Sequence, residues 1–345
     1  MSDQLFNNGL AATALGLVAA LLLLVPTAAV QYRRDGRLGV GDLATLVGAA
    51  VYGLALWTYT LLPFPAEGGF RCQRSRWDVW QSVQPIVEHG VLPLSHLLRQ
   101  PAFQQLALNV LLFLPLGAFV RLVAHRGLVV TTLLGLALSS AIETTQLTGV
   151  WGWYDCAYRT FDVDDLLTNT LGALVGGVLA WAFLHPDRRA GAALPTRISL
   201  GRRWVGFVSD LVFLVVVGGA AGLAWRAWLV HAQGVAQPDR GAAGLVQLGV
   251  PLLLEALLVL GAGRTVGEWA ISVRAVARRL PTPVARVVKL VTGIGGFALL
   301  AAPDLAWGGV LLAGFVVATL VASVRSAEHR GLSHWLAGMD LRISR

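Results

Sequence analysis

Three aspartates gather at the start of an apolar stretch, residues 159–177, which reads RTFDVDDLLTNTLGALVGG. Asp162, Asp165 and Asn169 are three and four residues apart, so they share one face of a helix. Charged side chains are costly inside a membrane and mark functional sites there. The structural alternative is capping, because aspartate oxygens accept the unpaired N–H groups of a helix start. Asp164 points away from this face, and we expect it to be a solvated cap.

A further carboxylate, Glu143, lies within another apolar stretch, and Gln146 follows three residues later on the same helix face. Capping does not explain an acidic residue inside a span, so Glu143 is a candidate for binding or proton transfer. We expect Glu143 either to pair with Arg159 or to share a proton with Asp165. The polar side chains together predict one binding site, which comprises Glu143, Asp165, Arg159, Asp162, Gln146, Asn169 and Asn109.

The composition explains what surrounds these residues. Of the 345 residues, 56% are hydrophobic and only 13% are charged, whereas soluble proteins carry about 25% charged residues. Such a chain predicts an all-α, polytopic membrane bundle. The net charge of +8 lies in short loops between apolar segments, so we expect membrane lipids and no nucleic acid as partners. Dinucleotide, phosphate-loop and metalloprotease motifs are absent, and His334 has no ligand-spaced companion, so we expect neither cofactor nor metal.

Hydropathy predicts about nine spans, and we interpret the first as a retained helix rather than a signal peptide. The eighth span is short and is expected to form a hairpin with the ninth around Pro303 and Asp304. The partly apolar residues 83–98 predict an interfacial or re-entrant helix. The predicted spans are residues 9–30, 43–63, 104–124, 128–150, 166–185, 204–224, 244–262, 287–302 and 306–323.

The distribution of arginine and lysine predicts the orientation. With the N-terminus outside, most of the 27 basic residues lie in inner loops and in a cytoplasmic tail, as the positive-inside rule requires. This predicts a multi-pass protein of the bacterial cytoplasmic membrane, whose polar site faces outward. A basic segment with two prolines divides the chain into a five-span domain, residues 1–186, and a domain of three to four spans, residues 187–345. The sequence indicates no particular oligomeric state.

Cys72 and Cys156 are the two cysteines, and this orientation puts both outside, where oxidation is permitted. They either form a disulfide that ties the long outer loop to the segment before the fifth span, or they are unrelated thiols. A disulfide needs a Cα separation of about 4.4–6.8 Å, which spacing in the sequence does not determine.

The first half resembles the VanZ-like family of small bacterial membrane proteins. The resemblance covers roughly residues 40–185 and depends on NVLLFLPLG at 109–117, ETTQ at 143–146 and the stretch 159–177. It implies a role in the cell envelope, with low-level resistance to teicoplanin-type lipoglycopeptides as the best-known phenotype, and it supplies no reaction. Gly172 and Gly176 have a GxxxG spacing, which predicts a closely packed neighbouring helix.

The second half resembles the RDD family over about residues 197–343. Arg203 and Asp210 lie seven residues apart on one helix face, followed by GRTVGEWAISVRAV at 263–276 and RGLSHWLAGMDL at 330–341. Two positions depart from the family. Trp335 follows the histidine where the family usually has aspartate, and Glu268 stands where it usually has a basic residue.

Three functions remain open. We expect a protein that recognises an envelope component or an amphiphilic antibiotic at the outward polar site. A membrane enzyme could instead use two carboxylates for acid–base work on a lipid-linked substrate. Some relatives of the RDD family have been linked to cation/proton exchange, which makes Arg203, Asp210 and Glu255 transport candidates. The structural alternatives are a stabilising pair of Arg203 with Asp210 and, for the whole chain, a lipid-facing scaffold.

Overall fold

The computed structural model describes residues 2–62, 64–65, 70–89, 91, 93–183, 195–235, 239–301 and 307–344. Nine helices in these ranges are long and apolar enough to cross a membrane, which confirms the predicted helical, multi-pass architecture. The predicted domain boundary at residues 186 and 187 and the predicted turn at Pro303 and Asp304 lie outside the described residues. The nine candidate spans are Asn8–Arg34, Val40–Leu61, Pro101–Leu122, Leu128–Leu147, Val163–Phe183, Leu200–Ala232, Gly241–Ala262, Thr282–Leu300 and Gly308–Arg325.

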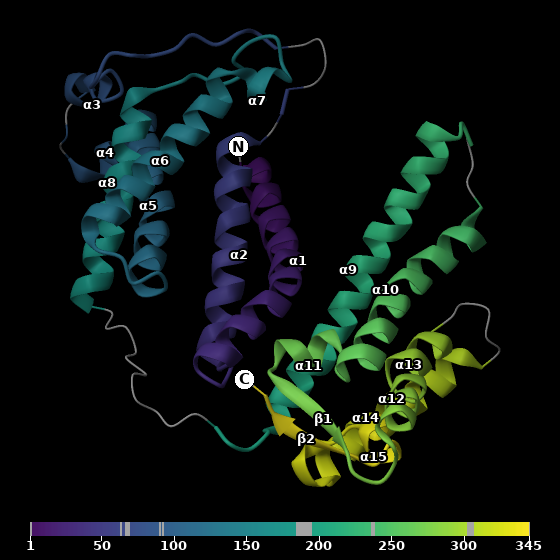
Figure 1. Ribbon diagram of the computed structural model, residues 1–345. Helices are drawn as coiled ribbons and strands as arrows, with labels where there is room; N and C mark the ends of the chain where they lie inside the picture. Colours follow the sequence, from purple (N-terminus) through teal and green to yellow (C-terminus); the bar gives the residue numbers. More distant parts are fainter. Residues whose placement is uncertain are drawn as a thin grey trace. The chain divides into compact units, whose positions relative to one another are not determined.

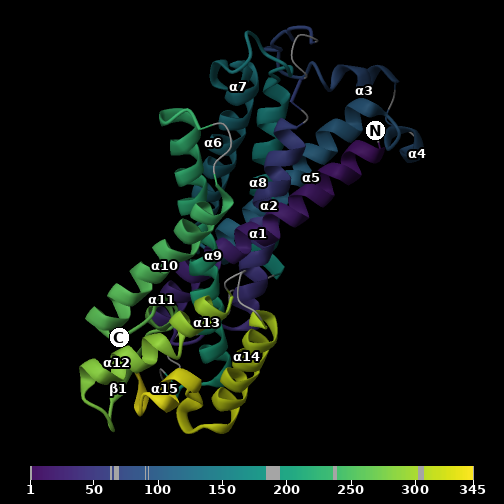
Figure 2. The same ribbon diagram turned by 90° about the vertical axis from the view of Figure 1, so that its right-hand side faces the viewer.

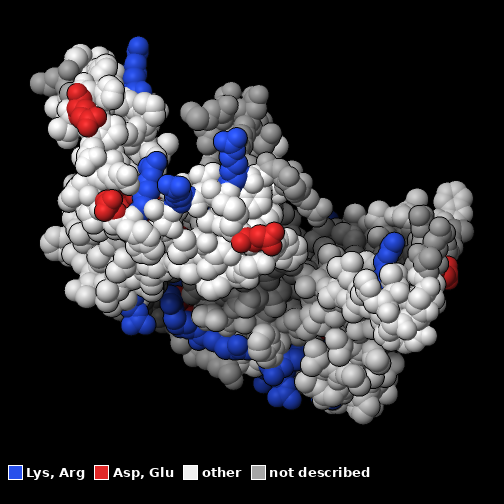
Figure 3. Space-filling model, turned by 90° about the horizontal axis from the view of Figure 1, so that it is seen from above, with Lys and Arg blue, Asp and Glu red and all other residues white. Residues whose placement is uncertain are grey.

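The chain divides into two compact units. The first comprises residues 1–17 and 48–191, and the second comprises residues 18–47 and 192–345. Helices α1 (Ser2–Arg34) and α2 (Val40–Leu61) therefore each contribute to both units. Figure 3 shows one face of the structure, on which few charged side chains lie among mostly uncharged residues, as expected for a chain with this composition.

The first unit is built around α5 (Pro101–Leu122), α6 (Leu128–Leu147) and α8 (Val163–Phe183), which lie together in Figures 1 and 2. Small residues bring α5 and α8 into close contact: a Cβ added at Gly172 or Gly176 would collide with a backbone carbonyl of α5. This confirms the packing predicted from the GxxxG spacing. Phe113 of α5 is fully buried in the resulting core.

Short helices connect the long ones in this unit. Helices α3 (Gln84–His89) and α4 (Leu94–Leu97) follow the long loop after α2, within the region expected to hold an interfacial helix. Helix α7 (Gly149–Gly152) follows α6 and includes Val150 and Trp151 at positive φ, so it is a tight turn rather than a regular helix. The loop that precedes α3 contacts the start of α8 through Trp80 and Ser82, as described below.

The second unit contains the long helices α9 (Leu200–Ala232) and α10 (Arg240–Ala262), together with several shorter elements. Strands β1 (Val273–Ala277) and β2 (Met339–Ile343) form an antiparallel pair in which Ala275 faces Leu341. Hydropathy indicates membrane spans, and it did not predict this pair of strands. The remaining elements are α11 (Val266–Ala270), α12 (Thr282–Val291), α13 (Ile294–Leu300), α14 (Gly308–Arg325), the 3-10 turn η1 (Ala327–His329) and α15 (Leu332–Leu336).

Candidate functional site

Two buried aspartates at the start of α8 hold the long loop of the first unit. Asp164 accepts the N–H groups of Trp80 and Ser82, both at 2.8 Å. Asp162 accepts the Ser82 hydroxyl at 3.0 Å and the N–H of Asp164 at 2.9 Å, the geometry of a helix cap. Asp164 is only 3% exposed, so the prediction of a solvated cap is wrong. The reason is that loop N–H groups removed from water need acceptors, and the Asp164 carboxylate supplies two.

The same loop is held by its backbone. Arg76 donates its N–H to the carbonyl of Phe161 at 2.8 Å and accepts the N–H of Val163 at 3.2 Å. The Arg76 guanidinium lies 3.7 Å from a carboxylate oxygen of Asp162. The rings of Trp77 and Phe161 are 4.5 Å apart. The loop therefore has a defined conformation against the start of α8, although about eighty residues separate the two in sequence.

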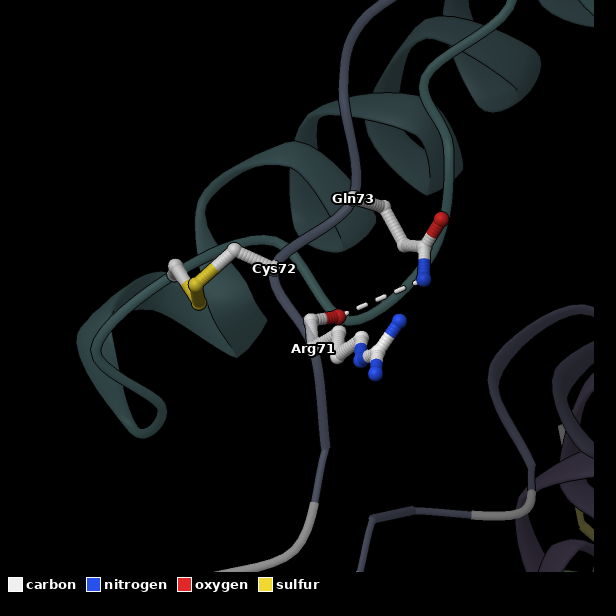
Figure 4. Close-up of a disulfide and its surroundings, with 4 residues drawn as sticks. Arg71, Cys72 and Gln73 are labelled. Atoms are coloured by element: carbon white, nitrogen blue, oxygen red, sulfur yellow. Dashed lines mark hydrogen bonds between the residues drawn. A yellow bond between two sulfur atoms is a disulfide. The ribbon is translucent and has the colours of Figure 1, made fainter.

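A disulfide joins the same two segments. Figure 4 shows the disulfide formed by Cys72 of this loop. Its partner is Cys156, and the two Cα atoms are 5.5 Å apart. Gln73 donates its backbone N–H to the carbonyl of Ala157 at 2.9 Å, and its side chain donates to the carbonyl of Arg71 at 3.3 Å. Of the two alternatives that the sequence left open, the structure contains the disulfide.

Glu143 has a backbone partner rather than either partner expected from the sequence. Its carboxylate accepts the N–H of Asp162 at 3.2 Å, and the residue is 3% exposed. Among the described residues, no ion pair joins Glu143 to Arg159, and no hydrogen bond joins it to Asp165. Both groups nevertheless lie close enough to Glu143 to interact with it electrostatically.

The Arg159 guanidinium binds the C-terminal end of α2. It donates to the carbonyls of Thr60 at 2.5 Å and Leu62 at 3.3 Å, and Gln146 donates to the same Thr60 carbonyl at 2.7 Å. Tyr158 donates to the carbonyl of Leu61 at 3.0 Å. Burial raises the pKa of the Tyr158 phenol, so this group keeps its proton. These contacts satisfy helix-end carbonyls that have no partner within α2.

The remaining predicted residues are Asn109 on α5 and Asp165 and Asn169 on α8. Asn109 donates to Asp165 at 2.7 Å, and the exposed Gln105 donates to the same oxygen at 3.4 Å. Asn169, one turn deeper, donates to the Ser139 hydroxyl at 2.9 Å, and its buried carbonyl oxygen has no hydrogen-bond partner among the described residues. The structure thus separates a buried framework from a partly buried pair formed by Asn109 and Asp165.

Exposed arginines and tryptophans lie on the loop that the framework holds. We call residues 71–80, which read RCQRSRWDVW, the Arg–Trp loop. Arg71, Arg74 and Arg76 are exposed. Trp77 and Trp80 are 63% and 64% exposed. These residues were not among the predicted site residues, although two tryptophans among three arginines in a loop predicted to lie outside the membrane are a usable signal.

The transport candidates of the second unit surround the start of α11. Asp210 accepts the N–H of Gly267 at 2.5 Å and the Thr265 hydroxyl at 3.0 Å. Glu255 accepts the N–H of Val266 at 3.3 Å, and its other oxygen is buried with no hydrogen-bond partner in the part of the chain that the structure describes. Arg203 is 1% exposed and lies over the ring of Phe207 at 4.7 Å. No ion pair joins Arg203 to Asp210 within the described part of the chain.

A buried charge network lies beside these residues. Glu268 contacts Lys289 at 2.5 Å and His334 Nε2 at 2.6 Å. Burial alone would raise the pKa of Glu268, but Lys289 and His334 hold that pKa well below its usual range. Burial lowers the pKa of His334 to about 4, against the opposing pull of Glu268, so its imidazole is neutral near pH 7. The acid at position 268, which departs from the RDD pattern, therefore has a basic partner within its own unit.

The described residues contain no group of three or more His, Cys, Asp and Glu side chains able to hold a metal ion.

The fold thus defines a multi-pass helical membrane protein whose first unit carries a buried polar framework beneath a disulfide-linked loop. Residues 49–184, which include all seven predicted binding residues, match the family model described as VanZ/LLP1. No curated protein and no solved structure matches the chain. The comparisons give no support for the RDD resemblance of the second half, which stays a prediction.

Proposed function

We propose that this is a cell-envelope protein of the bacterial cytoplasmic membrane that recognises an anionic amphiphile at the Arg–Trp loop. The amphiphile is an envelope lipid or a lipoglycopeptide of the teicoplanin type. The observation that carries the proposal is the pair of hydrogen bonds by which Asp164 holds Trp80 and Ser82. They fix a loop whose arginine and tryptophan side chains are exposed.

The chemistry of the loop matches such a ligand. Guanidinium groups bind phosphates and carboxylates through paired hydrogen bonds. Tryptophan combines an apolar ring with a polar N–H group and is enriched where membrane lipid meets water. A loop already held by a disulfide and buried hydrogen bonds loses little conformational entropy when it binds a ligand.

The predicted site residues take separate roles in this proposal. Glu143, Asp162, Arg159 and Gln146 form the framework, because each is bonded to backbone groups. Asn109 and Asp165 are only partly buried and would supply hydrogen bonds to amide or hydroxyl groups of the ligand. An orientation with the N-terminus outside and the C-terminus in the cytoplasm would put the Arg–Trp loop at the outer surface.

Binding to a lipoglycopeptide tests the proposal directly. The purified protein would be placed in nanodiscs, and its affinity for teicoplanin measured for the wild type and for a Trp77→Ala, Trp80→Ala double variant. Loss of two exposed aromatic contacts should weaken binding about tenfold or more. Trp181→Ala is the matched control, because Trp181 is 62% exposed near the opposite end of α8. Equal affinity of the double variant and the wild type would refute the proposal.

A growth assay adds the phenotype. Deletion of the gene should increase susceptibility to teicoplanin, and complementation with the wild type should restore resistance. Complementation with the double variant should fail, while the Trp181→Ala variant should succeed. If teicoplanin binding is lost in the double variant but susceptibility is unchanged, the link to resistance is wrong.

Cation/proton transport by the second unit is a second candidate, favoured by one observation. Glu255 lies in an apolar helix, and one of its carboxylate oxygens is buried without a hydrogen-bond partner from any described residue. A pH-driven cation flux in proteoliposomes that Glu255→Gln abolishes would support this function. Enzymatic use of Glu143 finds less support, because its buried carboxylate is already bonded to the Asp162 N–H.

A further inference from the structure

The second unit contains a cavity of about 260 Å³ whose wall changes character along its length. Arg203, Glu268, Lys289 and His334 line its polar end. Its apolar end is lined by Leu214, Ile294, Phe297 and Phe315. Leu214 lies eleven residues beyond Arg203 on α9, so the two ends are about 16 Å apart along the helix axis. The elements that line it are α9, α10, α11, α12, α13, α14 and α15, and α12 to α15 lie together in Figures 1 and 2.

Arg203 is the cation at the polar end that lacks a direct acceptor. Its Nε and Nη1 groups are buried and have no hydrogen-bond partner among the described residues. The ring of Phe207 covers one side of the guanidinium at 4.7 Å. A buried donor without an acceptor is costly, and a ligand that supplies the acceptor recovers that cost.

The other charged groups at the polar end of the cavity already have hydrogen-bond or ion-pair partners. Lys289 is paired with Glu268 at 2.5 Å. Asp210 accepts the Gly267 N–H and the Thr265 hydroxyl, and no ion pair of Arg203 with either carboxylate is present in the described part of the unit. The low pKa of His334 leaves its imidazole neutral near pH 7. Glu255 is bonded to the Val266 N–H, outside the cavity lining.

We propose that this cavity binds a single-chain anionic amphiphile, with its carboxylate or phosphate on the Arg203 guanidinium and its alkyl chain against Leu214, Phe297 and Phe315. The planar guanidinium donates two parallel hydrogen bonds to such a group. The volume equals that of about nine water molecules, which suits a chain of roughly eight carbons. The apolar wall excludes a small hydrophilic anion such as free phosphate as the natural occupant.

Octanoate is the probe for this proposal. The full-length protein in phosphatidylcholine nanodiscs would be dialysed against labelled octanoate, with empty nanodiscs as the background. We expect one saturable site per chain, and affinity for octanol about tenfold weaker or worse, because the alcohol lacks the charge-assisted pair. Inorganic phosphate should not compete. Failure to find saturable octanoate binding, or equal affinity for octanol, would overturn the proposal.

Variants at the two ends of the cavity separate charge from shape. Arg203→Gln should weaken octanoate binding about tenfold or more, while Arg274→Gln, which removes an exposed arginine of the same unit, should leave it unchanged. Leu214→Phe keeps Arg203 and fills the apolar end, so it should also abolish binding. This variant decides the matter if Arg203→Gln does not fold. Octanoate binding that survives Leu214→Phe in a folded protein counts against the cavity.

The natural source of the ligand can be identified by mass spectrometry of the intact protein released from its native membrane. A bound species with the mass of a fatty acid or of a single-chain phospholipid supports the proposal, and the mass distinguishes these two sources. The Leu214→Phe variant should lack that species. A co-purified species of equal abundance in the wild type and in this variant would show that it binds elsewhere and would contradict the proposal.

Discussion

Replacing Lys289 with methionine tests the buried charge network that Lys289 forms with Glu268 and His334 in the second unit. Lys289 and Glu268 are 2% and 3% exposed, and their charged atoms are 2.5 Å apart. Removing one member of a buried ion pair leaves an uncompensated charge and typically costs about 3–5 kcal/mol of unfolding free energy. We expect a loss of this size at pH 8.

His334 makes the loss depend on pH. In the wild type, burial holds the pKa of His334 at about 4, below the 6.5 expected in the unfolded chain. The unfolded state therefore binds a proton first, and the wild type loses stability as the pH falls from about 6.5 towards 4. In Lys289→Met, protonated His334 can replace the missing cation beside Glu268, at 2.6 Å. Its pKa should rise, and the variant should lose less stability in acid than the wild type does.

The assay is thermal unfolding of the purified protein in mild detergent at pH 8 and pH 5.5, followed by tryptophan fluorescence. The difference between wild type and Lys289→Met should shrink by about 1–3 kcal/mol at the lower pH, since each pKa unit corresponds to about 1.4 kcal/mol. Arg278→Met is the control, because Arg278 is 64% exposed in its pair with Asp340 and such pairs contribute about 0–1 kcal/mol.

Two results would refute this reasoning. One is a Lys289→Met protein as stable at pH 8 as Arg278→Met. The other is a loss of equal size at both pH values, which would show that His334 takes no proton from solvent when Lys289 is absent. Adding Glu268→Gln to Lys289→Met should recover much of the stability at pH 8, because no uncompensated charge is then buried.

Three further predictions concern the first unit. Gly176→Ala should lower the free energy of unfolding by about 1–3 kcal/mol, because it forces α5 away from α8. Gly53→Ala is the control and should be neutral or stabilising, because its new Cβ meets nothing within 4 Å. Equal melting temperatures of the two variants would contradict the packing. Serine at both Cys72 and Cys156 should cost up to about 4–5 kcal/mol, from a closed loop of 84 residues, and wild type melted with a reductant should match it. Asp164→Asn can accept only one of the two loop N–H groups well, so it should cost about 1–3 kcal/mol and speed tryptic cleavage in the Arg–Trp loop; unchanged cleavage would show that other contacts suffice.

The sequence predicted what is local to each helix. The long apolar runs predict the nine candidate spans, because a span needs about twenty apolar residues whatever its neighbours are. Gly172 and Gly176 were correctly predicted to admit a close neighbour, since small residues on one face leave room for another backbone. Helical periodicity also placed Asp165 and Asn169 on α8, but Asp162, which was expected on the same helix face, lies just before the helix in a β-bridge with Arg76.

The sequence could not predict what covers each face. Asp164 is buried because a loop some eighty residues earlier in the chain folds over it, and periodicity within α8 contains no information about that loop. Arg159 was expected near Glu143, yet it binds carbonyls at the end of α2, whose position depends on the tertiary fold. The roles of Trp77 and Trp80 could not be predicted either, because their position depends on contacts of the loop with residues some eighty positions later in the chain.

Both units use acidic side chains near helix starts as acceptors for backbone N–H groups. In the first unit Glu143, Asp162 and Asp164 serve the start of α8 and its covering loop. In the second, the first N–H groups around α11 are satisfied by Asp210, Glu255, Glu268 and Thr265. A carboxylate within or beside a span is therefore weak evidence for transport in this protein, because the backbone accounts for most of its hydrogen bonds. The stronger evidence for a ligand comes from buried groups that lack a hydrogen-bond partner among the described residues and from exposed aromatic side chains. These are the buried N–H donors of Arg203 in the second unit and the tryptophans of the Arg–Trp loop in the first.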